Sequence, residues 1–330
     1  MHFIAIAITL FAAILPVSEQ PKAPQYYPPP GRLIQIGSRQ LHLDCTGHGN
    51  PTVILVSGGD AYSIDWALVQ PRIAQRTRVC SYDRAGLGWS DPGPADETVE
   101  QTVADLHALL TAAGEKRPYI LVGASVGGSF IRAYQRAFPE DVAALVFSNS
   151  ANHIGLNVKG KTSLIWDLTE EEIRSAYPLP PSNKGPEPTH EGKPFDRLPR
   201  ELQSVRLWLD QRLWKSWNPV TAKPEMVLSW RKEFLREFDE VNGSTSPILG
   251  KLPVNVISSN PVLGRDECHS HSNAAACLDF LSTNSVHITA TGSGHEIHLY
   301  QPDTVVRAIL MTLSAVRNGV PLSVLPRPPS

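Results

Sequence analysis

Short apolar runs alternate with amphipathic segments over the first half of this chain. The runs are continuous and end at glycine or polar residues, as buried strands do, and they cover residues 51–57, 77–82, 119–123 and 142–147. Segments between and after them have the spacing of helices with one apolar face, at residues 66–75, 99–113 and 129–138. Because strands that alternate with helices are joined by right-handed crossovers, the pattern predicts a mostly parallel sheet covered by helices on both faces.

This alternation stops after about residue 151, where a block with a different pattern begins. Helical spacing is found there at residues 164–177, 201–217 and 226–241, and a proline-rich connector covers 178–194. The block also holds five tryptophans, Trp166, Trp208, Trp214, Trp217 and Trp230. So many aromatic residues indicate either a small core of its own or an apolar wall over a site. We expect most of them to be core and one or two to face a substrate.

The strand pattern returns near the end of the chain, at residues 253–258 and 285–290, followed by a closing helix at 302–317. Two short strands, 33–36 and 40–44, precede the first run as a hairpin. We therefore predict an α/β core formed by two parts of the chain, residues 32–151 and 251–320. The block at 152–250 is a helical cap or lid inserted into it, and residues 321–330 are a tail.

The N-terminus carries an apolar run at residues 3–17, which is shorter than the stretch of about 20 residues that spans a membrane. Such a length suits a signal peptide, although no Lys or Arg precedes the run and no A-x-A site follows it. We predict a signal peptide at 1–18 and a proline-rich tether at 19–31. An uncleaved membrane anchor and a buried N-terminal helix are the alternatives.

Charge and cysteine content narrow the function classes. Lys and Arg number 30 against 32 Asp and Glu, so the net charge of −2 gives no broad basic surface, and we exclude nucleic-acid binding. Four cysteines suit an exported protein, secreted or periplasmic, with one or two disulfides. Cys45 and Cys80 lie in two predicted strands, while Cys268 and Cys277 flank one loop. Free or buried thiols are the alternative, and the spacings do not match a zinc site.

The candidate chemistry begins at Ser125, in the sequence G-A-S-V-G-G of residues 123–128. A strand, a sharp glycine-framed turn and a helix would place its hydroxyl at the tip of the sheet, near a helix N-terminus. We therefore predict Ser125 as a nucleophile. An unassisted serine hydroxyl is a weak nucleophile, so a base and an acid that orients the base are needed as well.

The best candidate for the base is His295, in T-G-S-G-H-E directly after the last predicted strand. That loop lies at the same edge of the sheet as Ser125. The remaining histidines considered lack this context, and we expect them to be surface or packing residues: His153, His269, His271, His287 and His298.

The acid should follow the strand at 253–258, where the loop 260–267 offers two neighbouring carboxylates. We choose Asp266, with Glu267 as the alternative acid; a third reading is that both form a solvated charged loop with Arg265. Asn149 lies just past the preceding strand, where an acid could have stood instead, but an amide supplies no negative charge. With Asp266 or Glu267, the order along the chain is serine, acid, histidine.

Acyl transfer also requires donors directed at the developing oxyanion. The N–H of Val126, directly after the serine, is one candidate. The N–H of Gly59, in the glycine turn after the strand at 51–57, is the other. Removing one such donor typically costs on the order of 3 kcal/mol of transition-state stabilisation.

Four motifs in this order resemble those of the α/β-hydrolase superfamily: S-G-G-D at Ser57, Y-D-R-A-G-L-G-W-S-D at Tyr82, G-A-S-V-G-G at Gly123 and S-G-H at Ser293. The resemblance covers the core on both sides of the inserted block. It implies an eight-stranded, mostly parallel sheet flanked by helices, with a cap inserted after the sixth strand. It also implies Ser125 as nucleophile, His295 as base, and Gly59 and Val126 as oxyanion donors.

The same resemblance places the second strand beside the fourth, which implies a disulfide between Cys45 and Cys80. The Asp83-Arg84 pair and Trp89 belong to the motif at Tyr82 and are better interpreted as fixing a loop than as catalytic. Two departures from the family motifs leave the subfamily unassigned. Ala124 stands in place of a histidine, and Ser57-Gly58 stands in place of His-Gly.

A serine at position 125 argues against the relatives that open epoxides or carbon–halogen bonds with an aspartate nucleophile. We find no metal-binding cluster and no phosphate-binding motif, and so expect no cofactor. The resulting hypothesis is a serine hydrolase that cleaves an ester bond of a small-molecule acyl substrate with an apolar portion. Hydrolysis of amides, lactones or carbon–carbon bonds, acyl transfer, and a non-catalytic binding domain are the alternatives.

Overall fold

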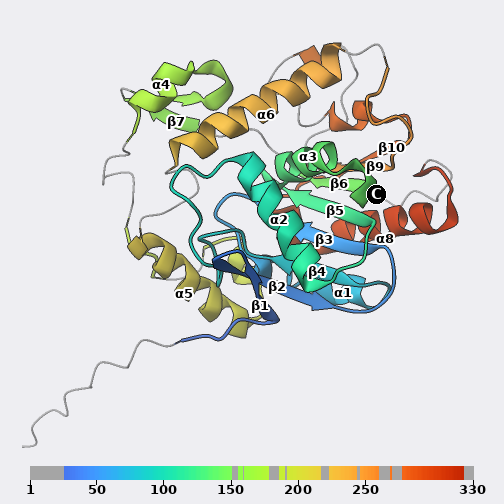
Figure 1. Ribbon diagram of the computed structural model, residues 1–330, viewed down its shortest axis with the longest axis horizontal. Helices are drawn as coiled ribbons and strands as arrows, with labels where there is room; N and C mark the ends of the chain where they lie inside the picture. Colours follow the sequence, from blue (N-terminus) through green and yellow to red (C-terminus); the bar gives the residue numbers. More distant parts are fainter. Residues whose placement is uncertain are drawn as a thin grey trace, which may run out of the picture.

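An eight-stranded sheet runs through the protein in the order β1-β2-β4-β3-β5-β6-β9-β10 (Figure 1). The computed structural model describes residues 26–150, 155–158, 160–177, 186–189, 192–216, 223–243, 246–259, 268–269 and 277–322. The strands of the sheet are β1 (Arg32–Ile36), β2 (Arg39–Thr46), β3 (Thr52–Val56), β4 (Val79–Tyr82), β5 (Tyr119–Ala124), β6 (Val142–Ser148), β9 (Val254–Ser258) and β10 (Ser285–Thr289). Within this sheet, β1–β2 and β2–β4 pair antiparallel, and the other described pairs are parallel. The predicted α/β-hydrolase sheet is therefore confirmed.

Both faces of the sheet are buried, which explains the unbroken apolar runs. In β3, Val53 and Leu55 belong to one apolar cluster, whereas Ile54 and Val56 belong to the other. Figure 1 shows α2 (Val99–Ala113) and α3 (Gly127–Ala137) on one face of the sheet, and α1 (Gln70–Ala74) and α8 (Pro302–Asn318) on the opposite face. Apolar side chains that alternate between two covered faces leave no room for polar positions within the strand.

The chain between β6 and β9 begins with a hairpin that the sequence did not predict. We expected a helix from residue 164, but Leu164 ends β8 (Lys161–Leu164), which pairs with β7 (Gly155–Val158). Gly160 makes the turn at a φ of +82°, where glycine carries no steric penalty, and donates its N–H to the Asn157 Oδ1 at 3.0 Å. The helix α4 (Glu170–Ser175) begins only at Thr169, which forms a capping box with Glu172.

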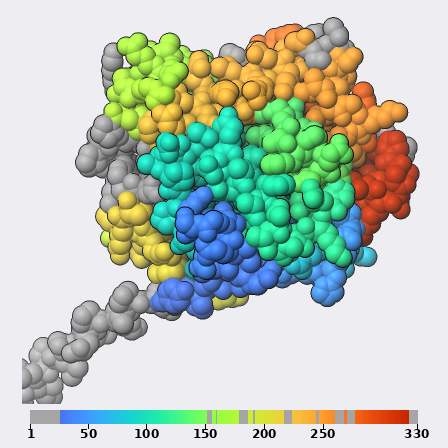
Figure 2. Space-filling view, in the orientation of Figure 1, coloured from blue at the N-terminus to red at the C-terminus, as the bar shows by residue number. Residues whose placement is uncertain are grey.

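The rest of this segment consists of α5 (Arg200–Ser216) and α6 (Pro224–Gly243), which lie against the core. Figure 2 shows α6 and the α4 region side by side along one edge of the molecule, above α2 and α3. Trp166 and Trp230 are buried, as expected for core residues, and Trp166 stacks on Phe234 at 4.6 Å between ring centroids. Trp217 lies outside the described residues. Arg132 of α3 pairs with Glu240 of α6 at 2.8 Å, so charged contacts also join the segment to the core.

Two disulfides cross-link the described chain. Cys45 and Cys80 are register partners in the β2–β4 pair and form one; Cys268 and Cys277 form the other. The expectation of one or two disulfides is confirmed, and such bonds are typical of proteins from oxidising compartments. None of the helices in the described part of the chain is both long and apolar enough to span a membrane.

Residues 26–31, the described end of the proline-rich tether, lie against the folded protein. The Tyr26 and Tyr27 rings contact the Trp208 ring, with centroids 5.9 and 5.6 Å apart. The Trp89 indole N–H donates to the Tyr27 carbonyl at 2.8 Å. This part of the tether is therefore packed on the surface rather than free. The predicted signal peptide at 1–18 and most of the tail at 321–330 lie outside the described residues.

Candidate active site

Ser125 stands on a sharp turn between β5 and α3, as its motif predicts. Its φ is +53°, a left-handed conformation that non-glycine residues rarely adopt, so the turn holds the serine in strain. The flanking glycines are required by close packing. A Cβ on Gly123 would lie 2.5 Å from the Gly127 carbonyl oxygen, and one on Gly127 would lie 2.5 Å from the Val56 carbonyl oxygen. The glycine spacing of the motif is thus a consequence of this turn.

His295 lies in the loop between β10 and α7 (Ile297–Tyr300), and its ring faces Ser125. The distance from His295 Nε2 to Ser125 Oγ is 2.9 Å, although the residues are 170 positions apart. Parallel strands bring their carboxyl ends to one edge of the sheet, and both residues follow such ends. The structure therefore brings the predicted serine and histidine into hydrogen-bond contact. Their roles as nucleophile and base stay predictions.

The predicted acids, Asp266 and Glu267, both lie outside the described residues. Within the described chain, the group against the other ring nitrogen of His295 is the side chain of Asn149. Its Nδ2 lies 3.2 Å from His295 Nδ1 and donates to the His295 carbonyl at 3.0 Å. Its Oδ1 accepts from the main-chain N–H of Ser259 at 3.3 Å and from the Ser259 hydroxyl at 3.2 Å. The sequence placed Asn149 at the right strand end but gave no sign of this contact.

The glycine turn after β3 approaches Ser125 closely. A Cβ on Gly58 would lie 2.9 Å from the Ser125 Cβ, so only glycine fits there without displacement. Arg84, a buried residue, donates to the carbonyls of Ser57 and Gly58 at 2.6 Å each and also to that of Gly59. Its guanidinium therefore binds the main chain of the whole turn, in agreement with the loop-fixing role predicted for it.

This clamp orients the predicted oxyanion donors. In a trans peptide the C=O and the N–H point in opposite directions, so a Gly58 carbonyl directed at Arg84 turns the Gly59 N–H away from it. Among the described residues, neither the Gly59 N–H nor the Val126 N–H has a protein acceptor. Both are available to a ligand oxygen, and their function as an oxyanion hole stays a prediction.

Asp83 and Trp89 also have structural contacts. The Asp83 carboxylate accepts from the Ser63 N–H at 2.7 Å and the Trp89 N–H at 3.3 Å, and it contacts His42 Nδ1 at 2.8 Å. All these atoms are buried. Asp83 therefore ties the loop after β4 to two neighbouring segments, as the loop-fixing interpretation requires.

A cavity of about 230 Å³ opens beside Ser125 and His295. Apart from those two residues and the turns already described, its lining consists of Asp60, Ala61, Asp65, Phe195, Arg206, Glu296 and His298. We expected one or two tryptophans of the inserted segment to face the substrate, but none of those that the structure describes lines this cavity. Most of these residues are polar, but the larger part of the surface that lines the cavity is apolar.

Arg206 reaches the cavity from α5, and nothing in the sequence pointed to it. It pairs with Asp65 at 2.5 Å and with Asp210 at 3.1 Å, and its guanidinium lies over the rings of Tyr62 and Phe195. Burial raises the pKa of Asp65 to about 6, although the charge of Arg206 acts in the opposite direction. A buried arginine from the inserted segment thus links that segment to the core at the site.

His298 is a packing residue, as expected, but it also borders the cavity. Its ring packs against that of Trp66 in a tilted arrangement, with centroids 4.6 Å apart, and burial lowers its pKa to about 3. The ring is therefore neutral at physiological pH. Its buried Nδ1 has no hydrogen-bond partner within the described structure.

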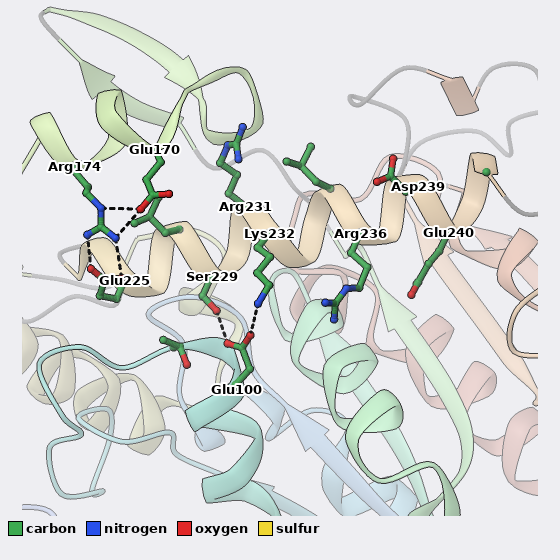
Figure 3. Close-up of a pocket in the computed structure, with 14 residues that line it drawn as sticks. Glu100, Glu170, Arg174, Glu225, Ser229, Arg231, Lys232, Arg236, Asp239 and Glu240 are labelled. Carbon is green, nitrogen blue, oxygen red and sulfur yellow. Dashed lines mark hydrogen bonds and ion pairs between the residues drawn. The ribbon is translucent and has the colours of Figure 1, made fainter.

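A larger hollow of about 1230 Å³ lies along α6, between α2 and α4 (Figure 3). Figure 3 shows several of its polar side chains paired with one another: Arg174 with Glu170 and Glu225, and Glu100 with Ser229 and Lys232. It shares no described lining residue with the cavity at Ser125, and no described histidine lines it. We therefore place the candidate active site at Ser125.

Comparisons with known proteins agree with this fold. Residues 51–178 match the family described as the α/β hydrolase fold. An esterase from Thermogutta terrifontis has the same fold, with a TM-score of 0.59 and 18% identity, over 86% of this chain and 97% of that chain. This chain therefore has the α/β-hydrolase fold.

Two curated relatives with higher sequence identity match over shorter stretches. The 2-hydroxy-6-oxononadienedioate/2-hydroxy-6-oxononatrienedioate hydrolase of Paraburkholderia xenovorans is 34% identical over 115 residues, which are 33% of this chain and 39% of that protein. "Probable transporter efuK" of Hormonema carpetanum is 34% identical over 156 residues, which are 44% of this chain and 22% of that protein. The chain thus spans less than half the length of both proteins.

Proposed function

We propose that this protein is a serine hydrolase that cleaves an ester or a related acyl bond. The observation that carries the proposal is the 2.9 Å contact between His295 Nε2 and the hydroxyl of Ser125, which is held on a strained turn at the mouth of a cavity. A histidine within hydrogen-bond reach of a serine is the arrangement that nucleophilic catalysis needs. The esterase and hydrolase relatives are consistent with this chemistry.

The proposed reaction has two stages. As Ser125 Oγ attacks the substrate carbonyl carbon, its proton passes to His295 Nε2, and the carbonyl oxygen becomes an oxyanion bound by the Gly59 and Val126 N–H groups. The ester bond then breaks, the alcohol leaves with the proton from His295, and an acyl-enzyme remains. A water molecule activated by the same histidine releases the acid and restores Ser125.

A fluorophosphonate probe, which reacts covalently with activated serines, tests this proposal. We expect the wild-type protein to be labelled and the Ser125→Ala variant to remain unlabelled, since the probe needs an activated hydroxyl. If the wild type is not labelled, the serine-hydrolase proposal is wrong. If the variant is labelled as strongly as the wild type, the reactive serine is a different one.

We further propose that the substrate carries a short acyl group, with only a small apolar portion. The 230 Å³ cavity is below the range of about 300–1,000 Å³ typical of pockets for drug-sized ligands, and Arg206 and Asp65 face it. A long alkyl chain there would have to lie against charged side chains. In a series of nitrophenyl esters, we expect kcat/KM for acetate and butyrate to exceed that for octanoate about tenfold. A maximum at octanoate would contradict this.

A further inference from the structure

We propose, building on the serine-hydrolase function above, that Asn149 determines which ring nitrogen of His295 carries the hydrogen. It holds the neutral imidazole in the tautomer that carries its hydrogen on Nε2, the atom that faces Ser125. Asn149 is thus a positioning residue that restrains the resting site, and an aspartate in its place would activate the enzyme.

The orientation of the Asn149 amide is fixed from two sides. The main-chain N–H of Ser259 can only donate, so the atom 3.3 Å from it must be the oxygen Oδ1. The main-chain carbonyl of His295 can only accept, so the atom 3.0 Å from it must be the nitrogen Nδ2. Exchanging the two amide atoms would break both bonds, and the assignment therefore follows from the hydrogen bonds around the group.

This orientation determines which nitrogen of His295 carries the hydrogen. Asn149 Nδ2 lies 3.2 Å from His295 Nδ1, and since an amide nitrogen only donates, Nδ1 must be the unprotonated acceptor. A neutral imidazole has one ring hydrogen, which then resides on Nε2. At 2.9 Å, Nε2–H donates to Ser125 Oγ instead of accepting its proton. The proton transfer to Nε2 in the proposed reaction therefore requires the other tautomer, in which Nδ1 carries the hydrogen and Nε2 has a free lone pair.

The position of Asn149 is as well fixed as its orientation. The main-chain N–H of Asn149 donates to the Ile257 carbonyl of the adjacent strand at 2.7 Å, and its φ is +45°. Asparagine tolerates this left-handed conformation better than most residues. A carboxylate can bind His295 Nδ1–H only if this amide moves aside. In a serine protease, replacing the triad aspartate by asparagine lowers kcat by about 10⁴ through the same change of tautomer.

The decisive variant is Asn149→Asp, compared with Asn149→Ala. A carboxylate at this position accepts the Nδ1 hydrogen and leaves the lone pair on Nε2, so we expect kcat for nitrophenyl acetate to rise about tenfold or more with little change in KM. Asn149→Ala supplies no acceptor and should not give this gain. A kcat for Asn149→Asp equal to or below that of the wild type would overturn the proposal. So would a tenfold loss in Asp266→Asn or Glu267→Gln, because a carboxylate would then already serve His295.

Nitrogen-15 NMR of protein labelled at histidine identifies the tautomer of His295 independently of any activity measurement. The His295 signals, assigned by their loss in His295→Gln, should show Nε2 protonated in the wild type and Nδ1 protonated in Asn149→Asp. Wild-type protein with Nδ1 protonated would refute the inference whatever its activity. If the tautomers are as expected but neither protein reacts with the fluorophosphonate probe, the proposed function fails while the inference about His295 stands.

Discussion

Replacing Ser125 or His295 by alanine should lower kcat for an activated ester by at least about a hundredfold, and replacing both should cost no more than replacing one. The two side chains act as one unit through their 2.9 Å contact, since the serine is a weak nucleophile without the base and the base has no task without the serine. The loss of kcat in the double variant should therefore be smaller than the product of the losses in the two single variants. The measurement is kcat for Ser125→Ala, His295→Ala and the double variant.

The same alanine substitutions should have a larger effect when they are made in the Asn149→Asp variant. In the wild type, the tautomer held by Asn149 already lowers the contribution of Ser125 and His295 to kcat. Removing either side chain therefore causes a smaller loss of kcat. With aspartate at position 149, the same alanine substitutions should lose about 10³-fold or more. Losses that multiply in the double variant would mean that Ser125 and His295 act independently, which a shared proton transfer does not allow. Thermal unfolding of each variant serves as the control for folding.

The fold and the contact between Ser125 and His295 could be predicted because their signals are local. A continuous apolar run marks a strand buried on both faces, and a serine framed by glycines marks the turn at its end. Once the strands are parallel, their carboxyl ends meet, and Ser125 and His295 must approach each other. The same rule placed Asn149 at the correct edge, but it did not predict the direction of the Asn149 hydrogen bonds, which depends on Ser259, the residue directly after β9.

Other parts of the site depend on contacts that no local pattern encodes. Arg206 borders the cavity because α5 packs across Tyr62 and pairs with Asp65, 141 positions earlier in the chain. The β7–β8 hairpin was missed because its strands have four residues each and only Leu156 among them is buried, so no apolar run marks them. His298 was expected to pack, and it does, but its position at the cavity follows from the turn of α7 after His295.

Replacing Arg84 by methionine should lower kcat about a hundredfold while leaving KM nearly unchanged. Methionine fills similar space but cannot donate to the carbonyls of Ser57, Gly58 and Gly59, which Arg84 now holds. The turn would then relax, and the Gly59 N–H would leave the position at which we propose that it binds the developing oxyanion. An interaction made only in the transition state affects kcat rather than KM. Steady-state kinetics on a short nitrophenyl ester measures both.

The matched control is Arg132→Met, which also removes a buried arginine. Arg132 donates to Gln135 and Glu240, at 2.5 and 2.8 Å, and none of its described hydrogen bonds involves the glycine turn. Both variants should unfold at lower temperature, since each leaves buried or half-buried partners unpaired. Only Arg84→Met should also lose turnover, because Arg84, and not Arg132, binds the glycine turn after β3 that carries the Gly59 N–H. Equal losses of kcat in the two variants would show that general destabilisation, rather than the position of the Gly59 N–H, explains the effect.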